Sequence, residues 1–356
     1  MGAEQPPVVC GKCTIERKIG EGGMATVYLG RHRTLGIPVA IKVLSAHLTT
    51  KDPRFAERFA REARLAARLR HPNIISVIDS GHEGGAHYLV MEYIDGPTCS
   101  QMVETEGKLA WPEAVKIVKQ VAEGLGYAAR KGIMHRDVNP ANIMIDSDGV
   151  ARIADLGLAK EITPDPGRVR LTRTGTSLGT PYYMSPEQIM SAKEVDVRSD
   201  IYSLGMTLYH LVCGHVPYTG TAFEIMTKHV QAPLPTPKTH VPKLPDAVCD
   251  VIKEMAAKNP DLRYQNYEDL CEDLEGILAG REVSAAGFED ESMVTAGVGA
   301  PHRLDKDASD EVLTRSLQKT SVVGPAGGKR KLVVFAVAAA MLAAAIALVM
   351  LWQGPS

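Results

Sequence analysis

The sequence predicts an α+β fold of two lobes, a small β-rich lobe with one helix and a larger helical lobe, plus one C-terminal transmembrane helix. Three observations support this prediction. Strand-like runs punctuated by glycine occupy the chain to about residue 94, and helical spacing dominates residues 95–279. A stretch of 20 apolar residues, 332–351, then matches the length of a helix that crosses a bilayer.

The composition excludes two classes of protein. The 356 residues carry 40 Lys and Arg against 42 Asp and Glu, a formal net charge of −2. This balance lacks the basic excess that draws proteins to nucleic acid. Six cysteines are too few for a disulfide scaffold in so long a chain. We therefore expect a protein that works in a reducing compartment and has no nucleic-acid partner.

The small lobe begins with a glycine-rich turn between two strand-like runs. Gly20, Gly22 and Gly23 lie in this turn, and their missing side chains let backbone N–H groups approach phosphate oxygens. A plain hairpin would explain the first two glycines equally well. A strand follows the turn where a dinucleotide-binding unit would have a helix, so that unit is disfavoured. The strand-like runs are 14–19, 26–31, 39–44, 75–80 and 88–93.

Lys42 lies among apolar residues in the third of these runs. A buried ammonium group needs an anionic partner. The next segment has Phe59 and Ala63 at helical spacing, and Glu62 lies on that inward side. Glu57 is the competitor, but it lies off the apolar stripe. We therefore expect Glu62 to pair with Lys42.

The strongest motif of the chain is His135-Arg136-Asp137-Val138-Asn139-Pro140-Ala141-Asn142, and Asp155 follows Asn142 by 13 residues. Two carboxylates and a carboxamide around one short strand can supply oxygen ligands for Mg²⁺ and a base for a hydroxyl group. Acidic side chains at this density cannot form a core, because their burial would be uncompensated. The motif therefore predicts a magnesium-dependent site.

These motifs, in this order, resemble those of the Hanks-type, eukaryotic-like protein kinases. The sequence Glu-Gly-Gly-Met-Ala in the glycine turn is similar to the corresponding sequence in the bacterial serine/threonine branch of this family. The resemblance covers residues 13–279 and implies the bilobal protein-kinase fold, with an N-lobe at 13–94 and a C-lobe at 95–279. It implies transfer of the γ-phosphoryl group of ATP to Ser or Thr of protein substrates, with Mg²⁺, or Mn²⁺ as a substitute.

The resemblance also assigns roles to single positions. Asp137 accepts the proton of the substrate hydroxyl, and Lys42 holds the ATP phosphates while it pairs with Glu62. Asn142 and Asp155 hold the metal ions, and Met91 resembles the gatekeeper before the hinge. Taken alone, each apolar member of the ATP-binding set would be better explained by core packing. That set is Ile19, Gly20, Glu21, Gly22, Gly23, Met24, Ala25, Thr26, Val27, Ala40, Lys42, Met91, Glu92, Ile94 and Met144.

Three further positions are expected to hold the fold. Ser185-Pro186-Glu187 resembles the family's Ala-Pro-Glu, which implies an ion pair between Glu187 and Arg263. Asp200 resembles the acid that braces the backbone of the catalytic loop. These three residues are structural expectations.

A hydroxyl-rich stretch at 171–177 precedes a Gly-Thr pair similar to that of Ser/Thr kinases. We expect autophosphorylation at Thr172 or Thr174, with Arg136 as a partner for the phosphate. The alternative is a loop rich in Ser and Thr only for solubility.

Asn139 departs from the family pattern, which has Lys two positions after the catalytic Asp. The loss of a preorganised electrostatic contact can cost roughly 10²–10³ in rate. The enzyme is then slow, or recruits another cation, or needs a partner. The alternative function is a pseudokinase-like scaffold that binds nucleotide without catalysis.

The ends of the chain complete the predicted organisation. Residues 1–12 form a leader, 280–331 a flexible juxtamembrane linker, 332–352 the transmembrane helix and 353–356 an external tail. Basic residues at 329–331 place the upstream part in the cytoplasm, so we expect a single-pass protein of the cell membrane. A buried helix of a soluble core is the alternative. The spacing of Ala336, Ala340 and Ala344 would let two copies of this helix pack closely. We therefore also expect that the protein can form a homodimer, through this helix or through the kinase domain.

Overall fold

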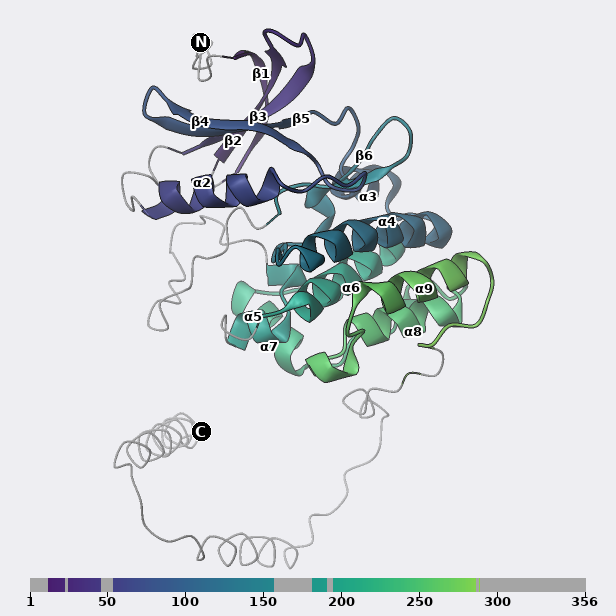
Figure 1. Ribbon diagram of the computed structural model, residues 1–356. Helices are drawn as coiled ribbons and strands as arrows, with labels where there is room; N and C mark the ends of the chain where they lie inside the picture. Colours follow the sequence, from purple (N-terminus) through teal and green to yellow (C-terminus); the bar gives the residue numbers. More distant parts are fainter. Residues whose placement is uncertain are drawn as a thin grey trace, which may run out of the picture. The chain divides into compact units, whose positions relative to one another are not determined.

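The computed structural model describes residues 12–22, 25–45, 54–156, 181–190, 195–285 and 288. Figure 1 shows a sheet with one helix, followed in the chain by a group of helices. The predicted α+β fold of a β-rich and a helical lobe is therefore present.

Five antiparallel strands form the sheet, and their order is β1-β2-β3-β5-β4. Helix α2 (Arg54–Ala66) packs on one face, where its Phe59 and Ala63 join Ala40, Leu89 and Met91 in an apolar cluster. A two-residue turn of glycines with positive φ closes the β4–β5 hairpin, a conformation that suits the twist of the strands. The strands are β1 (Cys13–Glu21), β2 (Ala25–His32), β3 (Pro38–Leu44), β4 (Val77–Glu83) and β5 (Ala86–Glu92).

The helical lobe is built around α6 (Val197–Cys213), most of whose residues are buried. Asp196 caps its first turn by accepting a hydrogen bond from the backbone N–H of Arg198, and Gly214 ends it in the left-handed conformation. Its apolar core is shared with the other long helices of the lobe. These are α3 (Cys99–Glu106), α4 (Trp111–Arg130), α7 (Ala222–Gln231), α8 (Asp246–Met255) and α9 (Tyr267–Leu278), beside the short α5 (Pro186–Met190).

A small hairpin of β6 (Ile143–Ile145) and β7 (Ala151–Ile153) lies against the segment that precedes β4. The backbone of Ile153 exchanges hydrogen bonds with the segment before β4: Ile153 N donates to Asn73 O at 2.9 Å, and Ile75 N donates to Ile153 O at 3.0 Å. The hairpin also carries the ends of the two loops that contain the predicted catalytic residues. These hydrogen bonds hold the hairpin, and with it the loops of Asp137 and Asp155, against the segment that leads into β4.

Each of the five strands overlaps its expected run, and β4 is displaced most, at 77–83 against the expected 75–80. The end of the domain also differs. The predicted linker starts at residue 280, yet Val283 and Ala285 are buried against α9. The backbone N–H groups of Ser284 and Ala285 donate to the carboxylate of Asp273 at 2.8 and 3.0 Å. Ordered packing therefore extends through residues 281–285, here called the strap.

Among the described residues, no helix has the length and apolar character needed to cross a membrane. The predicted transmembrane segment 332–352 lies outside these residues, as do the tail 353–356, the linker beyond 288 and the leader before Lys12.

Candidate active site

The glycine-rich turn joins β1 and β2, and Lys42 lies in β3, which pairs with β2. Glu21 pairs with Thr26 in the strand register, and Gly22 N donates to Ala25 O at 2.9 Å. Val27 lies opposite Lys42 in the neighbouring strand. Gly23 and Met24 lie outside the described residues. Val27, the last residue of the predicted phosphate-binding turn, is thus the residue that lies beside the lysine.

Lys42 forms an ion pair with Asp155. Its Nζ lies 2.7 Å from Asp155 Oδ1, and the two side chains are 16% and 31% exposed. Glu62 is on α2, but its side chain lies outside the described part of the chain, so the Lys42–Glu62 pair stays a prediction. The structure thus brings together the predicted phosphate-binding lysine and a predicted metal ligand, which the sequence places 113 positions apart.

The catalytic loop is tied to α6 by Asp200. The carboxylate of Asp200 accepts hydrogen bonds from the backbone N–H groups of His135 and Arg136, both at 2.7 Å. Complete burial raises the pKa of Asp200, although His135 and Arg136 act in the opposite direction. The Nε2 atom of His135 lies 2.7 Å from the carbonyl oxygen of Ala154 and so joins this loop to the residue before Asp155. Asp200 therefore braces the loop as the resemblance implies.

Two carboxamides converge on the main chain of Asp137. Asn139 Nδ2 and Asn142 Nδ2 both donate to Asp137 O at 2.9 Å, and Asn142 Nδ2 lies 3.5 Å from Asp137 Oδ2. Asn139 Oδ1 accepts from Ala141 N at 3.0 Å and caps the short helical turn η1 (Pro140–Asn142). Both ends of the Asn139 side chain are therefore used inside its own loop. Its capping role could have been inferred from the Asn-Pro sequence.

Asn142 and Asp155 have the chemistry and the placement of a site for a hard cation. Ala154 N donates to Asn142 O at 2.8 Å, which brings the residue before Asp155 against Asn142. The amide nitrogen of Asn142 faces Asp137, so its Oδ1 is the atom left to face a cation. Asp155 adopts a left-handed backbone with φ of 60°, a strained conformation that is frequent at functional sites. A carboxylate and an amide oxygen fit Mg²⁺.

The predicted adenine pocket has the expected apolar members near the hinge. Met91 is paired in register with Ala40, and both share an apolar cluster with Val27. Ile94 is buried, and Met144 lies in β6 of the connecting hairpin. The predicted adenine-binding residues are thus divided between the sheet, the hinge and that hairpin.

Glu92 of the predicted hinge has a partner that sequence patterns could not identify. Its carboxylate lies 3.2 Å from Arg152 Nη1, and Arg152 Nε donates to Asp146 Oδ2 at 2.8 Å. Gly96 follows, and a Cβ there would lie only 1.8 Å from the carbonyl oxygen of Ile145. The hinge is thus held close to the β6–β7 hairpin.

The predicted ion pair between Glu187 and Arg263 is present and buried. Arg263 Nη1 and Nη2 donate to the two carboxylate oxygens at 2.7 and 2.9 Å, and Ser199 Oγ also donates to Glu187. Burial acts to raise the pKa of Glu187, but the hydrogen bonds and charge of Arg263 outweigh it and lower the pKa. Glu187 is therefore ionised and anchors the start of α5.

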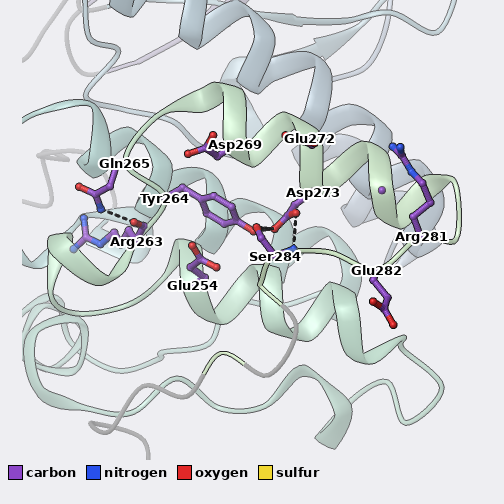
Figure 2. Close-up of a pocket in the computed structure, with 11 residues that line it drawn as sticks. Glu254, Arg263, Tyr264, Gln265, Asp269, Glu272, Asp273, Arg281, Glu282 and Ser284 are labelled. Atoms are coloured by element: carbon purple, nitrogen blue, oxygen red, sulfur yellow. Dashed lines mark hydrogen bonds between the residues drawn. The ribbon is translucent and has the colours of Figure 1, made fainter.

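A cavity of about 510 Å³ lies between α8, α9 and the strap, and no residue of the catalytic loop lines it (Figure 2). Burial, together with Asp273 and Asp269, raises the pKa of Glu254 in this cavity to about 7. No sequence motif indicated this cavity, because its acids come from elements that meet only in the fold.

Thr172 and Thr174, the predicted autophosphorylation sites, lie outside the described residues.

Known proteins are similar to this chain in sequence. The family model of the protein kinase domain matches residues 13–273. Serine/threonine-protein kinase PrkC of Bacillus subtilis is 36% identical over 331 residues, 91% of this chain and 50% of that protein. Serine/threonine-protein kinase PknB of Mycobacterium tuberculosis is 39% identical over 273 residues, 75% of this chain and 43% of that protein.

A solved structure is similar as well. The crystal structure of the Mycobacterium tuberculosis PknI kinase domain superposes with a TM-score of 0.61 at 31% identity, and the match covers 77% of this chain and 99% of that chain. This chain spans about half the length of the curated relatives it matches. With the family model matching most of its length and the catalytic loop, Lys42 and Asp155 brought together, the chain belongs to the protein kinase family.

Proposed function

We propose that this protein is a serine/threonine protein kinase that transfers the γ-phosphoryl group of ATP to hydroxyl groups of protein substrates. The observation that carries the proposal is the Lys42–Asp155 ion pair of 2.7 Å, held beside the catalytic loop by the contact between His135 and Ala154. A cation, an anionic metal ligand and the loop of Asp137 thus lie at one place. A binding module without chemistry would not require Asp137 there.

Each residue has a distinct part in the reaction. The substrate hydroxyl oxygen forms a bond to the γ-phosphorus, the bond to the bridging oxygen of the β-phosphate breaks, and ADP leaves. The carboxylate of Asp137 accepts the hydroxyl proton. Lys42 orients the phosphates, and Asn142 and Asp155 would hold Mg²⁺, which supplies neutralisation of the phosphate charge when it is bound. The backbone of the glycine turn covers the phosphates.

The cellular setting is part of the proposal. The 20 apolar residues at 332–351 and the basic residues at 329–331 support a single-pass membrane protein with its kinase domain in the cytoplasm. The hydroxyl groups of Thr172 and Thr174 are the proposed sites of autophosphorylation. A homodimer would let one copy phosphorylate another.

The test is phosphotransfer by the purified full chain in detergent, followed by mass spectrometry. We expect phosphate on Thr172 or Thr174 in the wild type and none in Asp137→Asn. Asp148→Asn is the matched control, because Asp148 is exposed and lies outside the site. Bound ATP without any phosphotransfer by the wild type would instead support the pseudokinase-like scaffold.

A further inference from the structure

We propose that Gln188 is a positioning residue for the catalytic loop, and that it connects segment 181–185 to Asp137 through the carbonyl group of Arg136. The proposal rests on the proposed phosphotransfer at Asp137. Gln188 lies on α5, which starts directly after segment 181–185. Its Nε2 donates to the backbone oxygen of Arg136 at 3.0 Å.

Arg136 needs external support because its backbone is strained. Its φ is 65°, in the left-handed region that residues other than glycine seldom adopt. Such conformations persist only where the surroundings over-determine them. Asp200 accepts from the N–H of Arg136 at 2.7 Å, and Gln188 donates to its C=O. The two contacts hold the residue before Asp137 from both of its backbone groups.

The orientation of the Gln188 carboxamide is fixed by its other partner. The Oε1 atom accepts from the backbone N–H of Ser185 at 3.0 Å and from Ser185 Oγ at 3.3 Å. A backbone N–H can only donate, so the oxygen must face Ser185 and the amide nitrogen must face Arg136. The Gln188 side chain therefore contacts segment 181–185 through its oxygen and the catalytic loop through its nitrogen.

The segment that Gln188 holds is itself anchored to α6. Ser203 Oγ donates to Tyr183 O at 2.7 Å, and Ser185 is fully buried. This segment follows the hydroxyl-rich stretch 171–177 in the chain. Segment 181–185 is therefore connected to α6 through Ser203 and, through Gln188, to the backbone of the residue before Asp137.

Replacing Gln188 by Glu removes the donor to Arg136 and adds one negative charge. A carboxylate of the same shape keeps the acceptor for Ser185 but cannot donate to the carbonyl of Arg136. Gln188→Met removes both contacts at similar volume. Gln101→Glu is the matched control, because Gln101 is exposed on α3 and its Oε1 accepts from Thr98 N in a capping box, where Glu serves equally well.

The experiment measures steady-state kinetics, hydrogen exchange and thermal unfolding of the full chain in detergent. For Gln188→Glu we expect kcat to fall about tenfold, because small misplacement of a catalytic group is costly, while the KM for ATP stays within about twofold. We expect faster exchange of the amides at 136–139, only a small drop in melting temperature from the loss of about 1 kcal/mol for one hydrogen bond, and no change in Gln101→Glu.

Unchanged kcat and unchanged exchange in Gln188→Glu would overturn the proposal, as would an equal loss in Gln101→Glu. If Gln188→Glu fails to fold, Gln188→Met is judged by the same two criteria. A wild type that transfers no phosphate would refute the proposed function, and the exchange of residues 136–139 would still decide whether Gln188 positions the loop.

Discussion

Arg263 and Glu187 face each other through two parallel hydrogen bonds of 2.7 and 2.9 Å, with side chains only 0% and 8% exposed. Because both charged groups are buried, each one is compensated by the charge of the other. The guanidinium also lies 4.8 Å from the ring centroid of Tyr202 on α6. The start of α5, the loop before α9 and the central helix are thereby connected.

We therefore expect Glu187→Gln to destabilise the protein by about 3–5 kcal/mol, because an uncompensated guanidinium would remain buried. Urea unfolding followed by circular dichroism measures the change. Glu268→Gln is the control, since Glu268 pairs with Arg130 on the surface and should cost less than about 1 kcal/mol. Equal, small losses for both variants would show that the buried pair has no special weight.

Asn139→Lys should change activity and stability in opposite directions. The added cation near the transferring phosphate should raise kcat, whereas loss of the cap to Ala141 N should cost about 1 kcal/mol of stability. Asn139→Ala should show the same loss of stability without the gain in kcat. Steady-state kinetics and thermal unfolding of both variants make the measurement. A kcat that stays level or falls in Asn139→Lys would mean that the amide is already compensated.

Glu254 should make the protein less stable as the pH rises. Its pKa is raised from 4.5 to about 7, so the folded state retains a proton that the unfolded state releases between these values. The contribution of Glu254 to stability is therefore complete below pH 4.5, falls as the pH approaches 7, and is lost above it. Glu254→Gln should be more stable than wild type at about pH 8, by about 1 kcal/mol for this partly exposed group, and equal to it at about pH 4.

Thermal unfolding at the two pH values checks this expectation. Glu106→Gln, an exposed position on α3, is the control for loss of one charge. A gain in Glu254→Gln that is the same at low and high pH would contradict the assigned protonation.

The strap should be part of the folded domain. A chain of residues 12–288 should be about 2 kcal/mol more stable than one of residues 12–279, because Val283 and Ala285 are buried and Asp273 accepts from the strap backbone. Asp273→Asn should weaken the longer chain more than the shorter one. Equal melting temperatures for the two lengths would return the domain boundary to residue 279.

Much of the site could be predicted because its chemistry is local in the sequence. Asp137, Asn139 and Asn142 lie in one short loop, and the next metal-ligand candidate follows after a single hairpin. The strands and helices were also predictable, since alternation and helical spacing record which faces are buried. The end of the domain was predicted too early, because residues 281–285 have a polar composition whose two apolar members become buried only against α9.

The sequence by itself determined the family motifs, the order of the two lobes and the residues able to do the chemistry. Only the tertiary structure decided that Lys42 meets Asp155, that Gln188 supports Arg136 and that Asp273 holds the strap. The physical reason is that a hydrophobic pattern specifies which side of an element is buried. The atoms that meet across two elements depend on how those elements pack, and these partners lie 11 to 113 positions apart.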